Sequence, residues 1–131
     1  MSINWVADIE DMHIKYGFHE AVNRLSPEDK KKFLNFRLSF LKEELAEMEK
    51  AMQEDNKEEV VDALIDLCVV AIGTLDLFQI NSYKAWDEVF DANMNKNPGV
   101  KASRPNPLGL PDLIKPEGWV APSHENNTGT L

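Results

Sequence analysis

The distribution of proline along the chain limits where long helices can form. Six of the seven prolines lie between Pro98 and Pro122, whereas the first 97 residues contain only Pro27. Because proline lacks an amide hydrogen and clashes with the preceding helical turn, it interrupts a helix at interior positions. Helical periodicity dominates the proline-poor part, and strand-like alternation is weak and short. The sequence therefore predicts an all-α fold with an irregular, proline-rich C-terminal arm.

Helix start signals divide the proline-poor part into four expected helices. The clearest signal is Ser26-Pro27, where a capping serine precedes a proline at the first helical position. Asp55 or Asn56 can cap the next helix, and Gly17 offers a break within the first. The expected helices cover about residues 4–25, 26–53, 56–80 and 81–97. We expect residues 1–97 to form a helical domain resembling a four-helix bundle, and residues 98–131 to form an irregular arm of the same domain.

The second expected helix has two apolar faces. At about 100° per residue, one stripe consists of leucine and methionine: Leu34, Leu38, Leu41, Leu45, Met48 and Met52. The other consists of Phe33, Phe36, Phe40 and Ala51, and Glu44 and Glu47 continue it. A helix with two apolar stripes needs two partners, so we expect the bundle to be extended by dimerisation.

Two acidic pairs, Glu44/Glu47 and Glu59/Asp62, are set into these apolar patterns. Each pair has i, i+3 spacing, which places its carboxylates side by side on one helix face. The third expected helix is apolar almost all round, so we expect it at the centre of the bundle with Glu59, Asp62 and Asp66 buried. Burying a carboxylate costs on the order of several kcal/mol unless it is paired or binds a metal. The pattern therefore predicts bound Mg²⁺, with Mn²⁺ as a substitute, because hard cations prefer oxygen ligands.

Each acidic residue also has a structural interpretation. Glutamates on helices commonly lie on a solvated face, and this is the main interpretation of Glu43. Glu59 follows Asn56 by three residues, which is the spacing of a capping box. Capping leaves Asp62 and Asp66 unexplained, and Asp66 could support a metal ligand or pair with a buried basic group.

Charge and cysteine content exclude several classes of protein. A formal net charge of −9 argues against nucleic-acid binding, which needs a basic surface. The longest apolar run, residues 67–75, is too short to span a membrane, and the N-terminus does not resemble a secretory signal. Cys68 is the only cysteine, so no internal disulfide can form and we expect a cytoplasmic protein.

Several catalytic schemes are not expected. The sequence has no Gly-rich phosphate loop, no Gly-x-Ser-x-Gly turn and no His-Glu-x-x-His zinc helix. Cys68 lies within an apolar helix, which disfavours a thiolate nucleophile. The three histidines, His13, His19 and His124, are scattered, so a histidine-rich metal site is not expected either.

With these motifs, the chain resembles the all-α nucleoside triphosphate pyrophosphohydrolases of the MazG-like superfamily. The family's Glu-Glu-x-x-Glu and Glu-x-x-Asp segments match residues 43–47 and 59–62, separated by a short spacer. The continuation through residues 62–74 is similar to members related to phosphoribosyl-ATP pyrophosphohydrolase, which are common in phages and bacteria. Residues 93–96 resemble the family's Asn-x-x-Lys region. Residues 11–18 resemble its His-x-x-Phe-Gly pattern, with tyrosine in place of phenylalanine, and residues 115–119 are similar as well.

The resemblance implies a Mg²⁺-dependent hydrolysis of (deoxy)nucleoside triphosphates to the monophosphate and pyrophosphate. The metal ligands that it implies are Glu44, Glu47, Glu59 and Asp62. It further implies that Asn93 and Lys96 approach the phosphates and that His13 lies near the base. Either Glu44 or Glu47 is the candidate general base. Family members are usually dimers or tetramers, in agreement with the two-faced second helix.

Three alternatives remain open at the level of sequence. Two are more specialised enzymes, a dedicated dUTP or dCTP hydrolase and a phosphoribosyl-ATP pyrophosphohydrolase. The third is a non-enzymatic helical module whose acidic face binds a basic partner. The sequence does not select the base.

Overall fold

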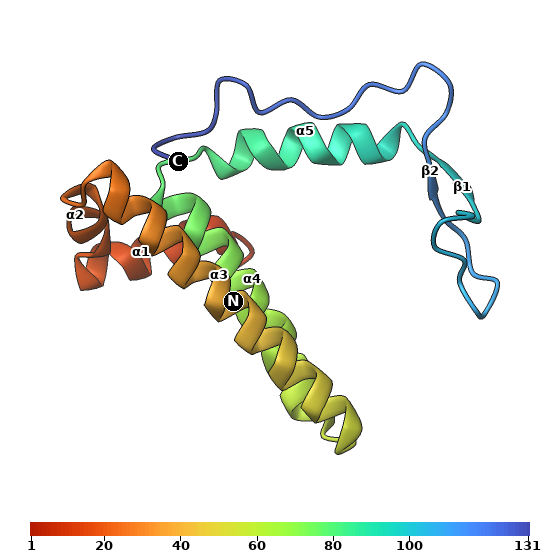
Figure 1. The fold of residues 1–131 in the computed structure, drawn as a ribbon, viewed down its shortest axis with the longest axis horizontal. Helices are drawn as coiled ribbons and strands as arrows, with labels where there is room; N and C mark the ends of the chain where they lie inside the picture. The colour runs from red at the N-terminus through yellow and green to blue at the C-terminus, as the bar shows by residue number, and fades with distance from the viewer. The chain divides into compact units, whose positions relative to one another are not determined.

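The computed structural model describes all 131 residues and contains five helices and one small antiparallel sheet (Figure 1). The elements are α1 (Trp5–Tyr16), α2 (Phe18–Asn23), α3 (Pro27–Gln53), α4 (Lys57–Leu77), α5 (Ser82–Met94), β1 (Asn97–Gly99) and β2 (Asp112–Ile114). The chain divides into two compact units, one of residues 1–82 and 128–131 and one of residues 83–127. The all-α class predicted from the sequence is confirmed.

The predicted helix boundaries agree closely with the structure because they depend on local capping. The Ser26 side chain accepts a hydrogen bond from the Asp29 amide at 3.1 Å, and Asn56 accepts one from the Glu59 amide at 3.2 Å. Gly17, at φ +69°, ends α1 and begins α2 in the left-handed conformation that glycine adopts most easily. The expected break at Gly17 is therefore real, and the first expected helix is two.

The core of the first unit is an antiparallel hairpin of α3 and α4 (Figure 1). Ala51 and Ala63 are almost fully buried, and the ring of Phe33 lies 5.9 Å from that of Phe78. Half-buried Arg37 crosses from α3 to α4, where it donates to the Val70 carbonyl at 3.1 Å and to the Thr74 hydroxyl at 3.0 Å.

The expectation that α4 is covered all round is wrong for the single chain. Val61, Leu64 and Ile65 are exposed, because only α3 and the short α1–α2 segment pack against this helix. The leucine and methionine stripe of α3 is also largely open, with Leu34, Leu38, Leu45 and Met52 exposed. Within the first unit, no second partner covers these stripes.

The helix α1 packs on α4 at Gly73, which has no side chain. A Cβ atom at Gly73 would lie 2.8 Å from Arg37 Nη2 and 3.3 Å from His13 Cε1. The absence of that atom lets α3 and α1 both approach α4 at this level. Near the end of α4, the chain's last residues return to the same unit, where the Thr130 amide donates to the Phe78 carbonyl at 2.8 Å.

The second unit contains α5 and a small hairpin that sequence reasoning missed. Strands β1 and β2 pair antiparallel, with Asn97 opposite Ile114 and Gly99 opposite Asp112. β1 starts at the last residue of the expected fourth helix, and β2 lies in the segment expected to be irregular. Trp119 joins this segment to α5 because its indole Nε1 donates to the Ala92 carbonyl at 2.7 Å. No helix has the length and apolar character needed to cross a lipid bilayer.

We predict that Gly73→Ala destabilises the protein although alanine is the better helix former by about 1 kcal/mol. The added methyl group would displace the Arg37 guanidinium from its two α4 acceptors and press on His13. We expect a net loss of about 1–2 kcal/mol in the free energy of unfolding, measured by denaturant titration. In an Arg37→Ala background the penalty should shrink, and equal effects in both backgrounds would contradict the assigned cause.

Candidate functional site

Glu44 lies on the side of α3 that faces α4. Glu44 follows Arg37 by two helical turns, so both side chains belong to the stripe that packs on α4. Arg37 contacts Val70 and Thr74, which fixes how α3 and α4 are aligned. Because the two helices are antiparallel, two turns further along α3 corresponds to two turns earlier on α4, so Glu44 lies near Asp66. The charge of Asp66 does act on Glu44. The two acidic segments identified in the sequence are thus brought to neighbouring levels of one hairpin.

Glu44 is the most perturbed acid in this cluster. Burial raises the pKa of its carboxyl to about 7, and the neighbouring Glu47 adds charge repulsion and a shared hydrogen bond. Asp66 and Glu43 raise the pKa of Glu44 further through repulsion. Its Oε2 atom is buried and has no hydrogen-bond partner. An acid in this state lacks the positive charge or donor that would stabilise its ionised form.

The remaining predicted ligands are more open than expected. Glu59 and Asp66 are half-buried and Asp62 is exposed, so the expectation that all three are buried in the single chain is wrong. The reason is the incomplete cover of α4, since nothing in the first unit packs over Asp62 and its exposed neighbours Val61 and Ile65. Glu59 also occupies the third position after the Asn56 cap, but its backbone amide, rather than a reciprocal side-chain contact, makes the bond seen there.

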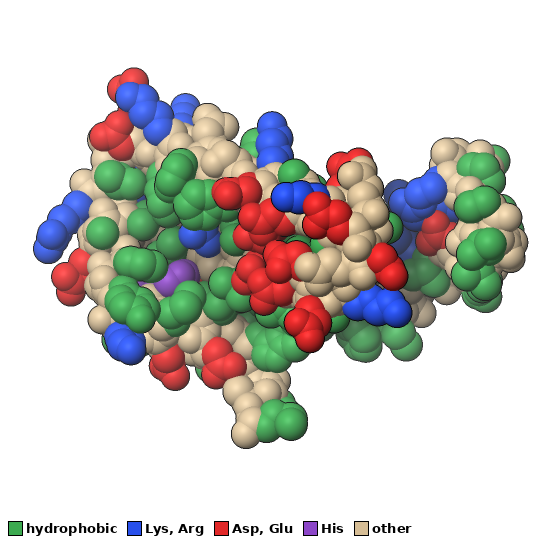
Figure 2. Space-filling view, turned by 90° about the horizontal axis from the view of Figure 1, so that it is seen from below, with side chains coloured by type: hydrophobic (Ala, Val, Ile, Leu, Met, Phe, Trp, Pro, Cys, Tyr) green, Lys and Arg blue, Asp and Glu red, His purple; other side chains and the backbone are tan.

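No basic side chain balances these five carboxylates. The ion pairs of the protein involve other residues, and none includes Glu44, Glu47, Glu59, Asp62 or Asp66. Figure 2 shows acidic side chains gathered over the α3–α4 hairpin beside hydrophobic ones. Oxygen donors without a protein counter-charge fit a hard divalent cation such as Mg²⁺. The unpartnered Oε2 of Glu44 is the atom that such an ion would satisfy most directly.

The other residues implied by the resemblance lie in different settings. Asn93 is exposed on α5, and Lys96 directs its ammonium group toward the Trp119 ring, 5.0 Å from the centroid. Lys115 lies over the same ring at 4.9 Å, so two cations and one indole gather in the second unit. His13 belongs to the first unit, where its side chain is 2% exposed and hydrogen-bonded to Asp76.

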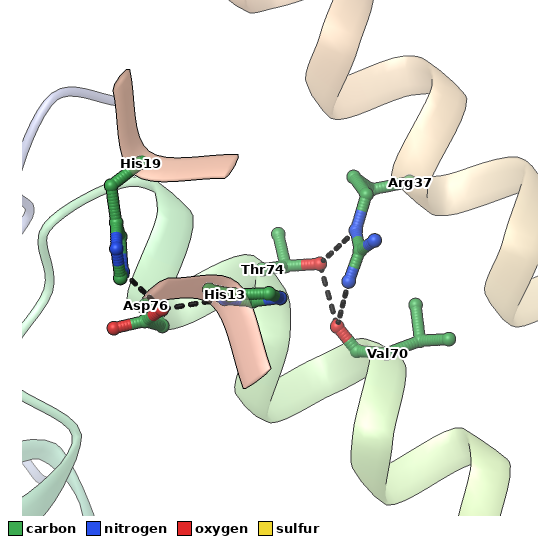
Figure 3. Close-up of polar contacts among 6 residues, drawn as sticks. All are labelled: His13, His19, Arg37, Val70, Thr74 and Asp76. Carbon is green, nitrogen blue, oxygen red and sulfur yellow. Dashed lines mark hydrogen bonds and ion pairs between the residues drawn. The ribbon is translucent and has the colours of Figure 1, made fainter. Parts of the chain in front are cut away.

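Sequence reasoning missed Arg37, His19 and Asp76. The Nδ1 atom of His13 and the Nε2 atom of His19 both lie 2.6 Å from Asp76 Oδ2 (Figure 3). The expectation that the histidines are scattered is therefore wrong for two of the three. Gly17 lies between His13 and His19 in the sequence, and the helix break there was a local signal that the two side chains could meet. Nothing near Asp76 in the sequence indicates that it contacts them. Arg37 could have been found as a basic residue on the stripe of Glu44.

A cavity of about 330 Å³ lies between α1 and α4, lined by Trp5, Asp8, Ile9, Ile65, Cys68, Val69 and Ile72. Its lining is mainly apolar. Ile65 lies next to Asp66 in the sequence and one turn after Asp62, so the cavity begins beside the acidic stripe of α4, which consists of Glu59, Asp62 and Asp66.

Comparison with known proteins assigns this arrangement to a family. A search of curated proteins found no match to the chain. The family model for phosphoribosyl-ATP pyrophosphohydrolase matches residues 17–93, which is more than half of the chain and contains the five carboxylates of α3 and α4 described above. Its members hydrolyse a phosphoric anhydride in a nucleotide triphosphate-like substrate, so the alternative of a non-enzymatic docking module is set aside. The chain belongs to the phosphoribosyl-ATP pyrophosphohydrolase family and is a pyrophosphohydrolase.

Proposed function

We propose that the protein hydrolyses (deoxy)nucleoside triphosphates to the monophosphate and pyrophosphate in a Mg²⁺-dependent reaction. The observation that carries the proposal is the state of Glu44, a carboxyl with a buried, unpartnered oxygen and a pKa raised to about 7 among like charges. Such an arrangement is unfavourable for folding unless the carboxylates bind a cation. The family model, which covers the same residues, supports the reaction class.

The ligands of the proposal are Glu44 and Glu47 on α3 and Glu59 and Asp62 on α4. When bound, Mg²⁺ would neutralise phosphate charge and lower the pKa of an attacking water; Mn²⁺ has similar ligand preferences. The water oxygen attacks the α-phosphorus, and the bond from that phosphorus to the bridging oxygen breaks. Pyrophosphate leaves with that oxygen. Glu44 or Glu47 accepts the proton of the water, a role that fits a pKa near neutrality.

We assign the phosphates and the nucleobase of the substrate to residues other than the metal ligands. Asn93 and Lys96 would contact the phosphates, and the cavity that begins at Ile65 has the lining expected for a nucleobase. The family resemblance implies that His13 lies near the nucleobase. A side chain that is 2% exposed and bonded to Asp76 would act there by positioning α1.

Two further features complete the proposal. The exposed leucines of α3 and the exposed Val61, Leu64 and Ile65 of α4 support a homodimer or homotetramer, whose second chain would cover these faces. The single cysteine and the formal charge of −9 support a cytoplasmic enzyme that does not bind nucleic acid. Phosphoribosyl-ATP is the second candidate substrate, and the family description favours it. A dedicated dUTP or dCTP hydrolase would be a narrower version of the first candidate, a (deoxy)nucleoside triphosphate pyrophosphohydrolase.

We predict that the purified protein with Mg²⁺ releases pyrophosphate and a monophosphate from at least one compound in a panel of nucleoside triphosphates, deoxynucleoside triphosphates and phosphoribosyl-ATP. Separation of the products by ion-exchange chromatography identifies both. Turnover should stop with a chelator and return with Mg²⁺ or Mn²⁺. Release of orthophosphate alone, or turnover unaffected by chelation, would reject the proposed chemistry.

We predict that Glu44→Gln and Asp62→Asn each lower kcat by about 10²–10⁴-fold, the range expected when a general base or an equivalent site group is lost. The fold should remain, as judged by circular dichroism and by a thermal midpoint at or above that of the unsubstituted protein. Glu49→Gln is the matched control, because Glu49 lies on the exposed side of α3. Full activity of both site variants would show that the ligands are assigned to the wrong residues.

The raised pKa of Glu44 predicts a pH dependence of stability in the metal-free protein. The folded state holds a proton on Glu44 up to about pH 7, whereas the unfolded chain releases it near its ordinary value of 4.5. The stabilising contribution of the protonated group is thus present at acidic pH and is lost as the pH rises through 7. In the presence of a chelator, the thermal midpoint should fall between about pH 5 and pH 8 by more in the unsubstituted protein than in Glu44→Gln. Identical slopes in the two proteins would contradict this assignment. Added Mg²⁺ should raise the midpoint most at the alkaline end.

A further inference from the structure

Three potential metal ligands from three helices meet in the first unit, apart from the carboxylates proposed to bind Mg²⁺. They are His13 of α1, His19 of α2 and Asp76 of α4, and their ligand atoms all lie within 4.8 Å of one another. Figure 3 shows both imidazoles directed at the same carboxylate. None of the three is among the proposed Mg²⁺ ligands.

The backbone brings these side chains together through one turn and one helix end. Gly17, at φ +69°, ends α1 and starts α2, and across this break the centroids of the two histidine rings lie 5.7 Å apart with the rings nearly perpendicular. Asp76 lies in the last turn of α4. The side chain of His13 is 2% exposed, whereas those of His19 and Asp76 are 29% and 18% exposed. The cluster therefore has a fixed inner ligand and a solvent-accessible outer side.

The two hydrogen bonds of the cluster share a single acceptor atom. Both histidines use the same oxygen, Asp76 Oδ2, each at 2.6 Å, and no protein group donates to the other oxygen. If the carboxylate served only as an acceptor, its two oxygens could take one imidazole each. The two imidazole nitrogens instead gather at one carboxylate oxygen, and all three ligand atoms lie close enough for one ion to bind them together.

The chemistry of the donor set selects the kind of ion. Two imidazole nitrogens and one carboxylate oxygen are ligands of Zn²⁺, which leaves a fourth tetrahedral position for water. Zn²⁺ bonds to nitrogen at about 2.0–2.1 Å, so ligand atoms around it are about 3.3 Å apart in a tetrahedron. The present hydrogen-bonded atoms would have to separate by less than about 1 Å. Nitrogen ligands are poor for Mg²⁺, which separates this cluster chemically from the carboxylates.

We propose that His13, His19 and Asp76 form a zinc-type metal site that fastens α1 and α2 to the end of α4. The site links residues that are far apart in the sequence, so bound metal stabilises the native state of the first unit. It binds the neutral imidazoles and therefore weakens as the histidines become protonated. Bound metal acts here by holding three helices together, and hydrolysis at the carboxylates does not depend on it chemically.

The test uses the full-length protein after chelation and removal of the chelator. Titration with Co²⁺ should give visible absorption bands of a tetrahedral ion, which Zn²⁺ abolishes by displacement and a large excess of Mg²⁺ does not. His19→Ala should weaken Co²⁺ binding by more than about 100-fold, because loss of even a supporting residue typically costs 10–100-fold. His19 is chosen because it is partly exposed, whereas replacing buried His13 could unfold the protein.

Two controls separate this site from the proposed Mg²⁺ site. His124→Ala removes the third histidine, an exposed residue of the second unit, and should leave the titration unchanged. Glu44→Gln should also leave it unchanged. Zn²⁺ should raise the thermal midpoint of the unsubstituted protein and of both controls, but not of His19→Ala.

Equal Co²⁺ affinity in His19→Ala and the unsubstituted protein would overturn the proposal. So would loss of the absorption bands in Glu44→Gln. In either case the three side chains form only a hydrogen-bonded contact between helices. The Mg²⁺-dependent hydrolysis would be unaffected by that result, because its own tests do not involve His19.

Discussion

The packing of α3 against α4 places charged groups inside a helix interface that is otherwise apolar. At one level Arg37 is accommodated because the Val70 carbonyl and the Thr74 hydroxyl accept its hydrogen bonds. Two turns away Glu44 enters the same interface and finds only other carboxylates. The hairpin thus satisfies its cation from within and leaves its anions unsatisfied. This asymmetry is the physical basis of the proposal that the hairpin binds a positive ion.

Local signals predicted the helices well because each one acts over a few residues. Ser26 and Asn56 cap helices by bonding to amides three positions later, and Gly17 breaks one through its own backbone angle. The β1–β2 hairpin escaped prediction because its strands have three residues each and contain or adjoin proline, so no alternation is visible. Strand pairing there is decided by contacts across a long loop.

The candidate site could be predicted only in part. The spacing within each acidic pair fixes which carboxylates share a helix face, and the hairpin then brings Glu44 and Asp66 near each other. Burial was overestimated at Asp62, since periodicity shows that a helix is apolar but not whether its own chain supplies every neighbour. The exposed Leu64 and Ile65 show the same limit. Asp76 could not be connected to His13 from sequence because their contact spans 63 positions.

The cavity between α1 and α4 gives the molecule an optical reporter of its own. Trp5 forms part of the wall and is 53% exposed, so its indole emission depends on whether water or another molecule fills the space. The other two tryptophans, Trp86 and Trp119, belong to the second unit and supply a separate background. Cys68, the single thiol of the chain, lines the same wall and offers one attachment point for a quencher. Occupancy of the space can therefore be followed by fluorescence, without adding any residue to the protein.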